Sequence, residues 1–256
     1  MIQQVARDFT MNEVLPVANE LDPQQGEIPM SLRDKMAEMR YFGIIVPEEY
    51  GGIGLGCFEY CLITEELARG WMSVASIIAR GNGIFGADTM SEEQRRKYLP
   101  RSASGEFLAA AALSEPDTGS DLSSISCRAR REGDEYVING NKYWCTFADG
   151  ADYIMLFART GEPPNQTRRH IGISGFIIEK ERGKLPPGVS GAPIPKIGYF
   201  GWKTWELSFD NCRVPANCLV GEEGKAFYIM ASGLEVARAH TAARAIGVAR
   251  GALEDA

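Results

Sequence analysis

The sequence predicts an α+β multidomain protein in which a helical segment is followed by a β-rich segment and then by a final helix. Apolar residues recur at helical spacing over the first hundred or so positions. From about Phe107 the period changes to two, and after Gly221 it returns to helical spacing. We therefore expect a helical domain over 1–107, a β domain over 108–220 and the first helix of a further helical domain over 221–256.

The first segment contains three clear helical stretches. Residues 32–43 carry apolar side chains at helical spacing, and Gly43 lies where a helix would stop. Residues 58–70 follow a glycine-rich turn. A third, charged stretch opens at Ser91, a favourable N-cap, and is expected to end before Pro100.

The middle segment alternates β-forming runs with turn residues. Asn139-Gly140, between two apolar runs, predicts a hairpin turn. Three further strands are expected, at 153–160, 173–181 and 206–215. The segments between them, 161–169 and 183–193, are expected to be surface loops. These signals favour a sheet or a barrel.

The last 23 residues, LEVARAHTAARAIGVARGALEDA, read as helix to the end. A helix end normally needs a cap or other partners for its free carbonyl groups, and no stop signal is present. We therefore expect the chain to be cut inside a longer helical element.

Composition excludes several classes of protein. A net charge of -7 argues against a nucleic-acid partner, which would need clustered positive surface. The sequence has no signal-peptide-like start and no apolar stretch long enough to cross a bilayer, so a cytoplasmic protein without a membrane span is expected. The six scattered cysteines should be reduced and buried, and Cys57 and Cys61 lack a second pair for a metal site.

Two glycine-containing motifs invite a binding interpretation. GGIGLG at 51–56 lacks the G-x-G-x-x-G spacing and a preceding strand, so we interpret it as a turn between helices. LSEPDTGSD at 113–121 lies where helices give way to strands. Its small and hydroxyl residues could present N–H groups to a phosphate or a polar ring edge, although a capped turn explains it equally well.

Trp144 and Thr146 would point to the same face of a strand. A flat indole beside a hydroxyl donor suits a bound isoalloxazine ring. The alternative is a core tryptophan with an incidental threonine.

Taken together, these blocks resemble the acyl-CoA dehydrogenase family. The family signature Thr/Ser-Glu-Pro-x-x-Gly-Ser-Asp is similar to residues 114–121, and its Trp-x-Thr to 144–146, which follow a matching ING-K run at 138–142. Residues 201–217 and 233–256 resemble the end of its β domain and the opening helix of its C-terminal bundle. The resemblance implies an N-terminal helical domain, a middle antiparallel β-barrel-like domain and the start of that bundle.

The resemblance also implies an oxidoreductase with FAD, an acyl-CoA substrate, an electron-transferring flavoprotein as partner and a homotetramer. Leu113 and Ser114 would meet the pyrimidine edge of the flavin, Trp144 would pack on its rings and Thr146 would bond near N5. The implied cofactor residues are Ala111, Leu113, Ser114, Gly119, Ser120, Trp144, Cys145 and Thr146, and the implied substrate residues are Ser120, Glu235 and Arg238. Ala111 replaces a frequent aromatic residue, and Trp205 a frequent small polar one.

No catalytic base is assigned. The family's usual glutamate lies in later bundle helices that this sequence does not contain, and the alternative position, immediately before Arg238, holds Ala237. Glu235 would point about 200° away from Ala237 along a helix. His170 lies in a polar loop, His240 is expected on the helix surface, and a hydrolase triad lacks a nucleophile elbow.

The expected function is FAD-dependent α,β-dehydrogenation of acyl-CoA thioesters, in the context of fatty-acid metabolism. Two alternatives remain. The chain could be a non-catalytic partner subunit that keeps the fold for assembly, or an offshoot that eliminates a group from a CoA thioester without net oxidation.

Overall fold

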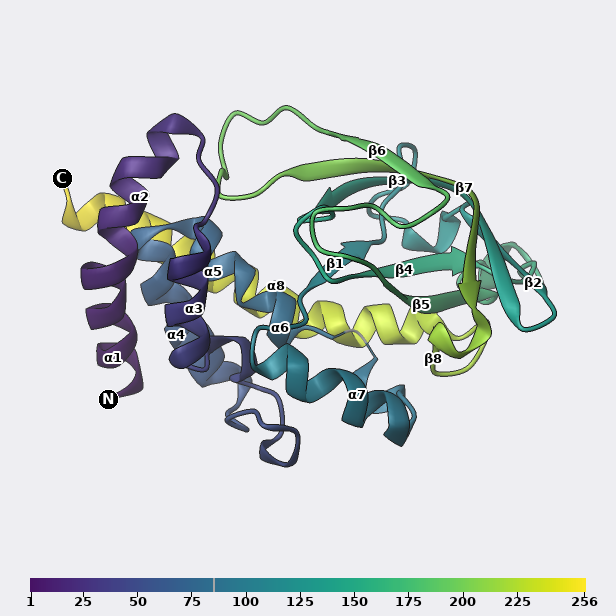
Figure 1. The fold of residues 1–256 in the computed structure, drawn as a ribbon, viewed down its shortest axis with the longest axis horizontal. Helices are drawn as coiled ribbons and strands as arrows, with labels where there is room; N and C mark the ends of the chain where they lie inside the picture. Colours follow the sequence, from purple (N-terminus) through teal and green to yellow (C-terminus); the bar gives the residue numbers. More distant parts are fainter. Residues whose placement is uncertain (85) are drawn as a thin grey trace.

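The computed structural model describes residues 1–84 and 86–256, and it confirms the predicted order of helices, strands and a final helix (Figure 1). The α-helices are α1 (Ile2–Phe9), α2 (Leu15–Leu21), α3 (Met30–Glu38), α4 (Cys57–Gly70), α5 (Met72–Ile77), α6 (Ala79–Asn82), α7 (Glu92–Ala103) and α8 (Ala226–Glu254). The strands are β1 (Ala109–Ala112), β2 (Arg128–Glu132), β3 (Glu135–Thr146), β4 (Tyr153–Arg159), β5 (Ile173–Glu179), β6 (Val189–Pro193), β7 (Thr204–Pro215) and β8 (Leu219–Val220).

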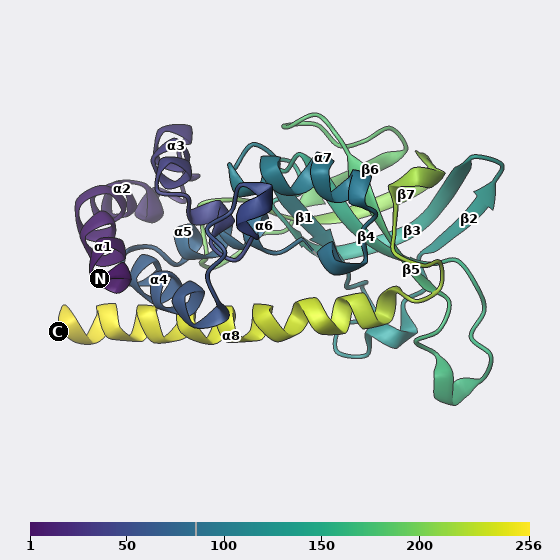
Figure 2. The same ribbon diagram turned by 90° about the horizontal axis from the view of Figure 1, so that it is seen from below.

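Helix α8 lies along both the helical and the β-rich parts of the molecule (Figures 1 and 2). Its last turns pack closely on α4, because Gly247 has no side chain: a Cβ there would lie 2.2 Å from the carbonyl oxygen of Glu65. Arg250 of α8 forms ion pairs with Glu65 and Glu66 of α4. These contacts with α4 hold the C-terminal end of α8 against the N-terminal helices.

The strands form one sheet in the order β6-β7-β3-β2-β4-β5-β8, and β1 pairs with β4. Most strand pairs are antiparallel, but β1 runs parallel to β4. The sheet is therefore mixed, whereas a purely antiparallel sheet was expected. Every residue of β4 is buried, as an apolar strand with both faces covered requires. The aromatic rings of Phe107 and Tyr153 stack at 4.5 Å beside α7.

The predicted hairpin turn at Asn139-Gly140 is wrong. The β2–β3 turn is at Gly133-Asp134, where Gly133 has a φ of +63°. Asn139-Gly140 lies inside β3, where its pairing with β7 shifts register. A Cβ at Gly140 would lie 2.7 Å from the Cα of Cys127, so this glycine permits a close backbone approach.

Three other boundaries differ from expectation. Helix α7 begins at its Ser91 cap, with Ser91 Oγ accepting a hydrogen bond from Gln94 N at 3.1 Å, but it continues through Pro100 to Ala103. Helix α3 ends before Gly43, because Arg40 takes a left-handed conformation with φ of 59°. The expected loop at 183–193 contains the edge strand β6. Packing of the last turn of α7 offsets the hydrogen bond that Pro100 cannot donate.

The cysteines are all free thiols. Burial raises the pKa of Cys127 and Cys212 to about 11, so these thiols stay protonated and behave as small apolar side chains. Cys57 is exposed, contrary to the expectation that the cysteines are buried. Within the described residues, no helix is long and apolar enough to cross a membrane.

Candidate functional site

The two stretches that the sequence singled out, around Ser114 and around Trp144, lie side by side. Tyr143 N donates a 2.8 Å hydrogen bond to Ser114 O. The ammonium group of Lys142 donates to Leu113 O at 2.9 Å. One backbone and one side-chain hydrogen bond therefore hold the motif at 113–121 against strand β3, as a single ligand-binding surface would require.

A buried ion pair fixes this contact. Lys142 is fully buried and its Nζ lies 2.9 Å from Oε1 of Glu115, which is itself 6% exposed. Glu115 also accepts hydrogen bonds from Ser126 N and Oγ, each at 2.7 Å, and from Cys127 N at 2.9 Å. Burial raises the pKa of Glu115, but Lys142 and these N–H donors outweigh burial, so its pKa is lowered overall.

Neither Glu115 nor Lys142 was assigned a role from the sequence. Both stand within the motif blocks, but their pairing depends on a contact between positions 27 residues apart. The presence of a lysine in an otherwise β-forming run was the one available signal. It did not reveal which carboxylate would neutralise it.

Trp144 projects from a bulge in β3. The residue has a φ of +62° where the β3–β7 register shifts, and its indole is 58% exposed. The core interpretation of this tryptophan is therefore wrong. The intervening Cys145 is fully buried and faces away from solvent, so the strand anchors itself through Cys145 and presents a flat apolar surface through Trp144.

Thr146 follows on the same strand and lines a cavity. Its hydroxyl lies 3.3 Å from the hydroxyl of Thr204 on β7, and either group can be the donor. Ala111 of β1 lines the same cavity. A hydroxyl that already has a neighbouring hydroxyl can orient its proton toward a ligand acceptor and receive a hydrogen bond in return.

Gly119 and Ser120 occupy an exposed turn. Glu115 N donates to Thr118 O at 2.8 Å and Thr118 N donates back to Glu115 O at 3.1 Å, so residues 115–118 form a turn. A Cβ built on Gly119 would meet nothing within 4 Å. The turn thus leaves open space over its small residues, and a ligand can still occupy that space.

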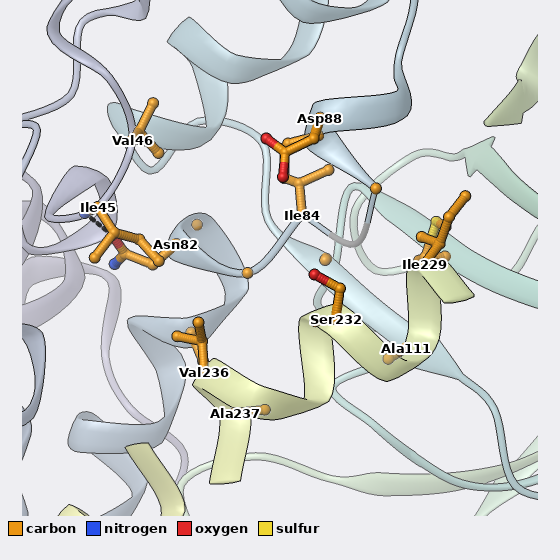
Figure 3. A pocket seen from close by; sticks show the side chains of 18 of the residues that line it. Ile45, Val46, Asn82, Ile84, Asp88, Ala111, Ile229, Ser232, Val236 and Ala237 are labelled. Atoms are coloured by element: carbon orange, nitrogen blue, oxygen red, sulfur yellow. Dashed lines mark hydrogen bonds between the residues drawn. The ribbon is translucent and has the colours of Figure 1, made fainter. Parts of the chain in front are cut away.

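The cavity has a volume of about 1410 Å³ and follows one face of α8 (Figure 3). Ser232, Val236 and Ala237 of α8 line it, with Ala111, Ile84 and Asn82 on other elements. Glu235 and Arg238 are exposed on α8 and are not among the lining residues. The structure therefore brings Ala111, Thr146 and Ala237 to one cavity, but leaves Glu235 and Arg238 outside it.

His240 is buried, so its expected place on the helix surface is wrong. It is 3% exposed, its ring stacks on Tyr60 at 4.8 Å, and its Nε2 lies 2.9 Å from Ala75 O. A carbonyl oxygen only accepts hydrogen bonds, so Nε2 carries the proton. Burial, with a smaller contribution from Arg244, lowers the pKa of His240 to about 3.

The buried neutral His240 should make stability depend on pH. The folded pKa of about 3 lies below the ordinary 6.5, so the unfolded chain takes up a proton first as the pH falls. The stabilisation is complete above pH 6.5 and is lost as the pH drops toward 3, by about 2 kcal/mol at pH 5. Urea unfolding at pH 7.5 and pH 5 should show this loss, and His240→Gln should remove it. His170→Gln, which alters the other histidine, should retain it; equal pH dependence in wild type and His240→Gln would contradict the prediction.

Two family models match the chain: the N-terminal domain of acyl-CoA dehydrogenase over residues 1–106 and the middle domain over 110–212. The acyl-CoA dehydrogenase of Bacillus subtilis (strain 168) is 39% identical over 100% of this chain and 66% of its own length. The chain belongs to the acyl-CoA dehydrogenase family. The motif residues at 114–121 and 144–146 thus lie within or beside segments that the family models match.

Two further relatives are named for other acyl-CoA substrates. The (2S)-methylsuccinyl-CoA dehydrogenase of Cereibacter sphaeroides is 40% identical over 99% of this chain and 47% of its own length. A solved glutaryl-CoA dehydrogenase from Mycobacterium smegmatis in complex with FADH2 has a TM-score of 0.86 at 28% identity, over 99% of this chain and 62% of that one. The chain spans about half to two thirds of the length of these relatives.

Proposed function

We propose that this chain contributes the flavin- and thioester-binding part of an FAD-dependent acyl-CoA dehydrogenase, which forms a trans double bond between the α and β carbons of an acyl-CoA. The observation that carries the proposal is the exposed Trp144 indole on a strand segment that the Tyr143–Ser114 hydrogen bond holds beside Leu113 and Ser114, two residues before Thr146, which lines a cavity. Family membership and the FADH2 complex of a structural relative support it.

The residues present fit an FAD ring system. An indole that is 58% exposed offers apolar area for a planar ring, and Thr146, two residues further along the strand, lines the cavity. Leu113, Ser114 and Thr146 would hold the ring, and Gly119 and Ser120 would lie by the pyrophosphate and the CoA arm. Bound FAD would supply hydride acceptance.

The chain's own residues would bind and orient the thioester and exclude water from it. The α8 face around Val236 and Ala237 supplies apolar cavity wall, which favours an acyl chain over solvent. Ala237 cannot remove a proton, so the proposal requires a base at another position. An electron-transferring flavoprotein as electron acceptor and a homotetramer belong to the same proposal and rest on the family.

The test is flavin binding with a matched pair of variants. Full-length protein should purify yellow and lose its yellow colour when an acyl-CoA is added. Trp144→Ala should weaken FAD binding about tenfold, because stacking and buried apolar area are lost. Phe58→Ala, which removes a 71% exposed ring from α4, should not. A colourless protein whose melting temperature is unchanged by FAD and acyl-CoA would refute the proposal.

A further inference from the structure

Two arginines line the cavity without a carboxylate partner. Arg80 of α6 and Arg244 of α8 are both lining residues, and neither forms an ion pair with any residue in 1–84 or 86–256. Arg80 lies 5.9 Å from the ring of Trp202, and its Nε has no hydrogen-bond partner among these residues. Both arginines are partly buried, and guanidinium groups with reduced access to solvent are normally paired.

The surrounding groups are neutral hydroxyls. Arg244 donates to Tyr199 Oη at 2.9 Å and to Thr241 Oγ1 at 2.9 Å, while its Nε has no partner in the described chain. Tyr60, 2% exposed, also lines the cavity, and its hydroxyl has no described partner. The neighbouring His240 is neutral, as argued above. Several donors of the described chain therefore lie along this cavity without a carboxylate partner.

Electrostatics reinforces this picture. Burial lowers the pKa of Arg80, and Arg244 lowers it further, while the acidic groups that would raise it are tyrosines. Two like charges in a partly desolvated cavity repel each other, and an anion between them would relieve both the repulsion and the lost hydration. Among the described residues, the acidic groups that line the cavity, Glu49, Asp88, Glu92 and Glu222, form no ion pair with either arginine; Glu92 bonds Arg95 and Arg96, and Glu222 bonds Lys225.

We infer that this end of the cavity binds a carboxylate at the far end of the acyl group, so that the substrate is the CoA thioester of a dicarboxylic acid. The inference rests on the proposed function and specifies its substrate class. Arginine suits this role because its planar fork matches a carboxylate and remains charged when buried.

The placement along α8 is consistent with a short acyl group. Ala237 and Arg244 both line the cavity and are seven positions apart, which corresponds to about 10 Å along the helix. The Arg244 side chain covers part of that distance, because its guanidinium donates to Thr241 Oγ1 and so lies about one helical turn from Ala237. A short acyl chain with its reacting carbons near Ala237 can therefore bring a terminal carboxylate toward this guanidinium.

The test compares two four-carbon thioesters that differ at the far end. Full-length, FAD-containing protein should bind succinyl-CoA at least tenfold more tightly than butyryl-CoA in isothermal titration calorimetry. Arg80→Gln and Arg244→Gln should each weaken succinyl-CoA binding at least tenfold and leave butyryl-CoA binding within twofold, which also shows that the variants fold. Arg96 lies on α7 and its side chain is 76% exposed. The control variant Arg96→Gln should therefore change the affinity for neither thioester.

The outcomes separate this inference from the function on which it rests. Equal affinity of the wild type for both thioesters, or a preference for butyryl-CoA, overturns the carboxylate assignment even where butyryl-CoA bleaches the flavin. Binding of neither thioester, with no bleaching, overturns the proposed function and this inference together. The wild-type comparison decides the matter if a variant fails to fold.

Discussion

Lys142→Met should lower the free energy of unfolding by about 3–5 kcal/mol, the typical cost of removing one partner from a buried ion pair. Lys142 is fully buried, and without it the carboxylate of Glu115 would remain in a 6% exposed position with only N–H and hydroxyl donors. Urea unfolding followed by circular dichroism measures the change. The loss should be greatest near neutral pH, where Glu115, whose pKa is lowered in the folded protein, is ionised.

Lys184→Met is the matched control. Lys184 and its partner Glu181 are each 68% exposed, and exposed pairs contribute little to stability. The double variant Lys142→Met with Glu115→Leu should be less destabilised than Lys142→Met alone, because no charge is then left buried. If Lys142→Met and Lys184→Met were equally stable, the buried pair would not have the role assigned to it.

The same substitution should weaken cofactor binding. Lys142 donates to Leu113 O as well as to Glu115, so its loss frees the motif at 113–121 from strand β3. We expect purified Lys142→Met to retain less FAD than wild type even at temperatures where it is folded. Absorbance at the flavin band, normalised to protein, gives this ratio, and Lys184→Met should match wild type.

The sequence predicted those features that depend on local patterns. Helical spacing located α3, α4 and α7, β-forming runs located β4, β5 and β7, and Ser91 located the start of α7. Each of these signals acts within a few residues along the chain. The family motifs extended this to the adjacency of Ser114 and Trp144, which the Tyr143–Ser114 hydrogen bond demonstrates.

Features that depend on contacts between residues distant in the chain could not be predicted from the sequence. Asn139-Gly140 has the local chemistry of a hairpin turn, but the close approach of Cys127 and the pairing with β7 place it inside a strand. His240 lies in a polar-looking helical run, and the packing of α8 on α4, through Tyr60, and on α5, through Ala75, buries it. The same packing brings Arg244 near Arg80. Burial of a polar side chain is a tertiary property, and no periodicity in one segment reveals it.

Ala237→Glu should give this 256-residue chain, loaded with FAD, a general base on α8, whose described cavity-lining residues include no carboxylate. Ala237 lines the cavity beside Val236 and Ser232 (Figure 3), so a carboxylate there would face bound thioester. We expect the exchange of the α protons of butyryl-CoA with deuterated solvent to accelerate by about 10² to 10⁴, the usual contribution of a positioned base. Mass spectrometry of recovered butyryl-CoA measures the exchange, which requires proton removal alone.

Two controls separate position from charge. Ala237→Gln has nearly the same size as Ala237→Glu but cannot accept the proton, so it should exchange at the wild-type rate. Ala242→Glu adds the same carboxylate at an exposed position of α8, outside the cavity lining, and should also leave the rate unchanged. If Ala237→Glu bound butyryl-CoA but exchanged no faster than Ala237→Gln, the reacting carbons would not lie beside residue 237. The proposed path of the acyl chain along α8, from Ala237 toward Arg244, would then be wrong.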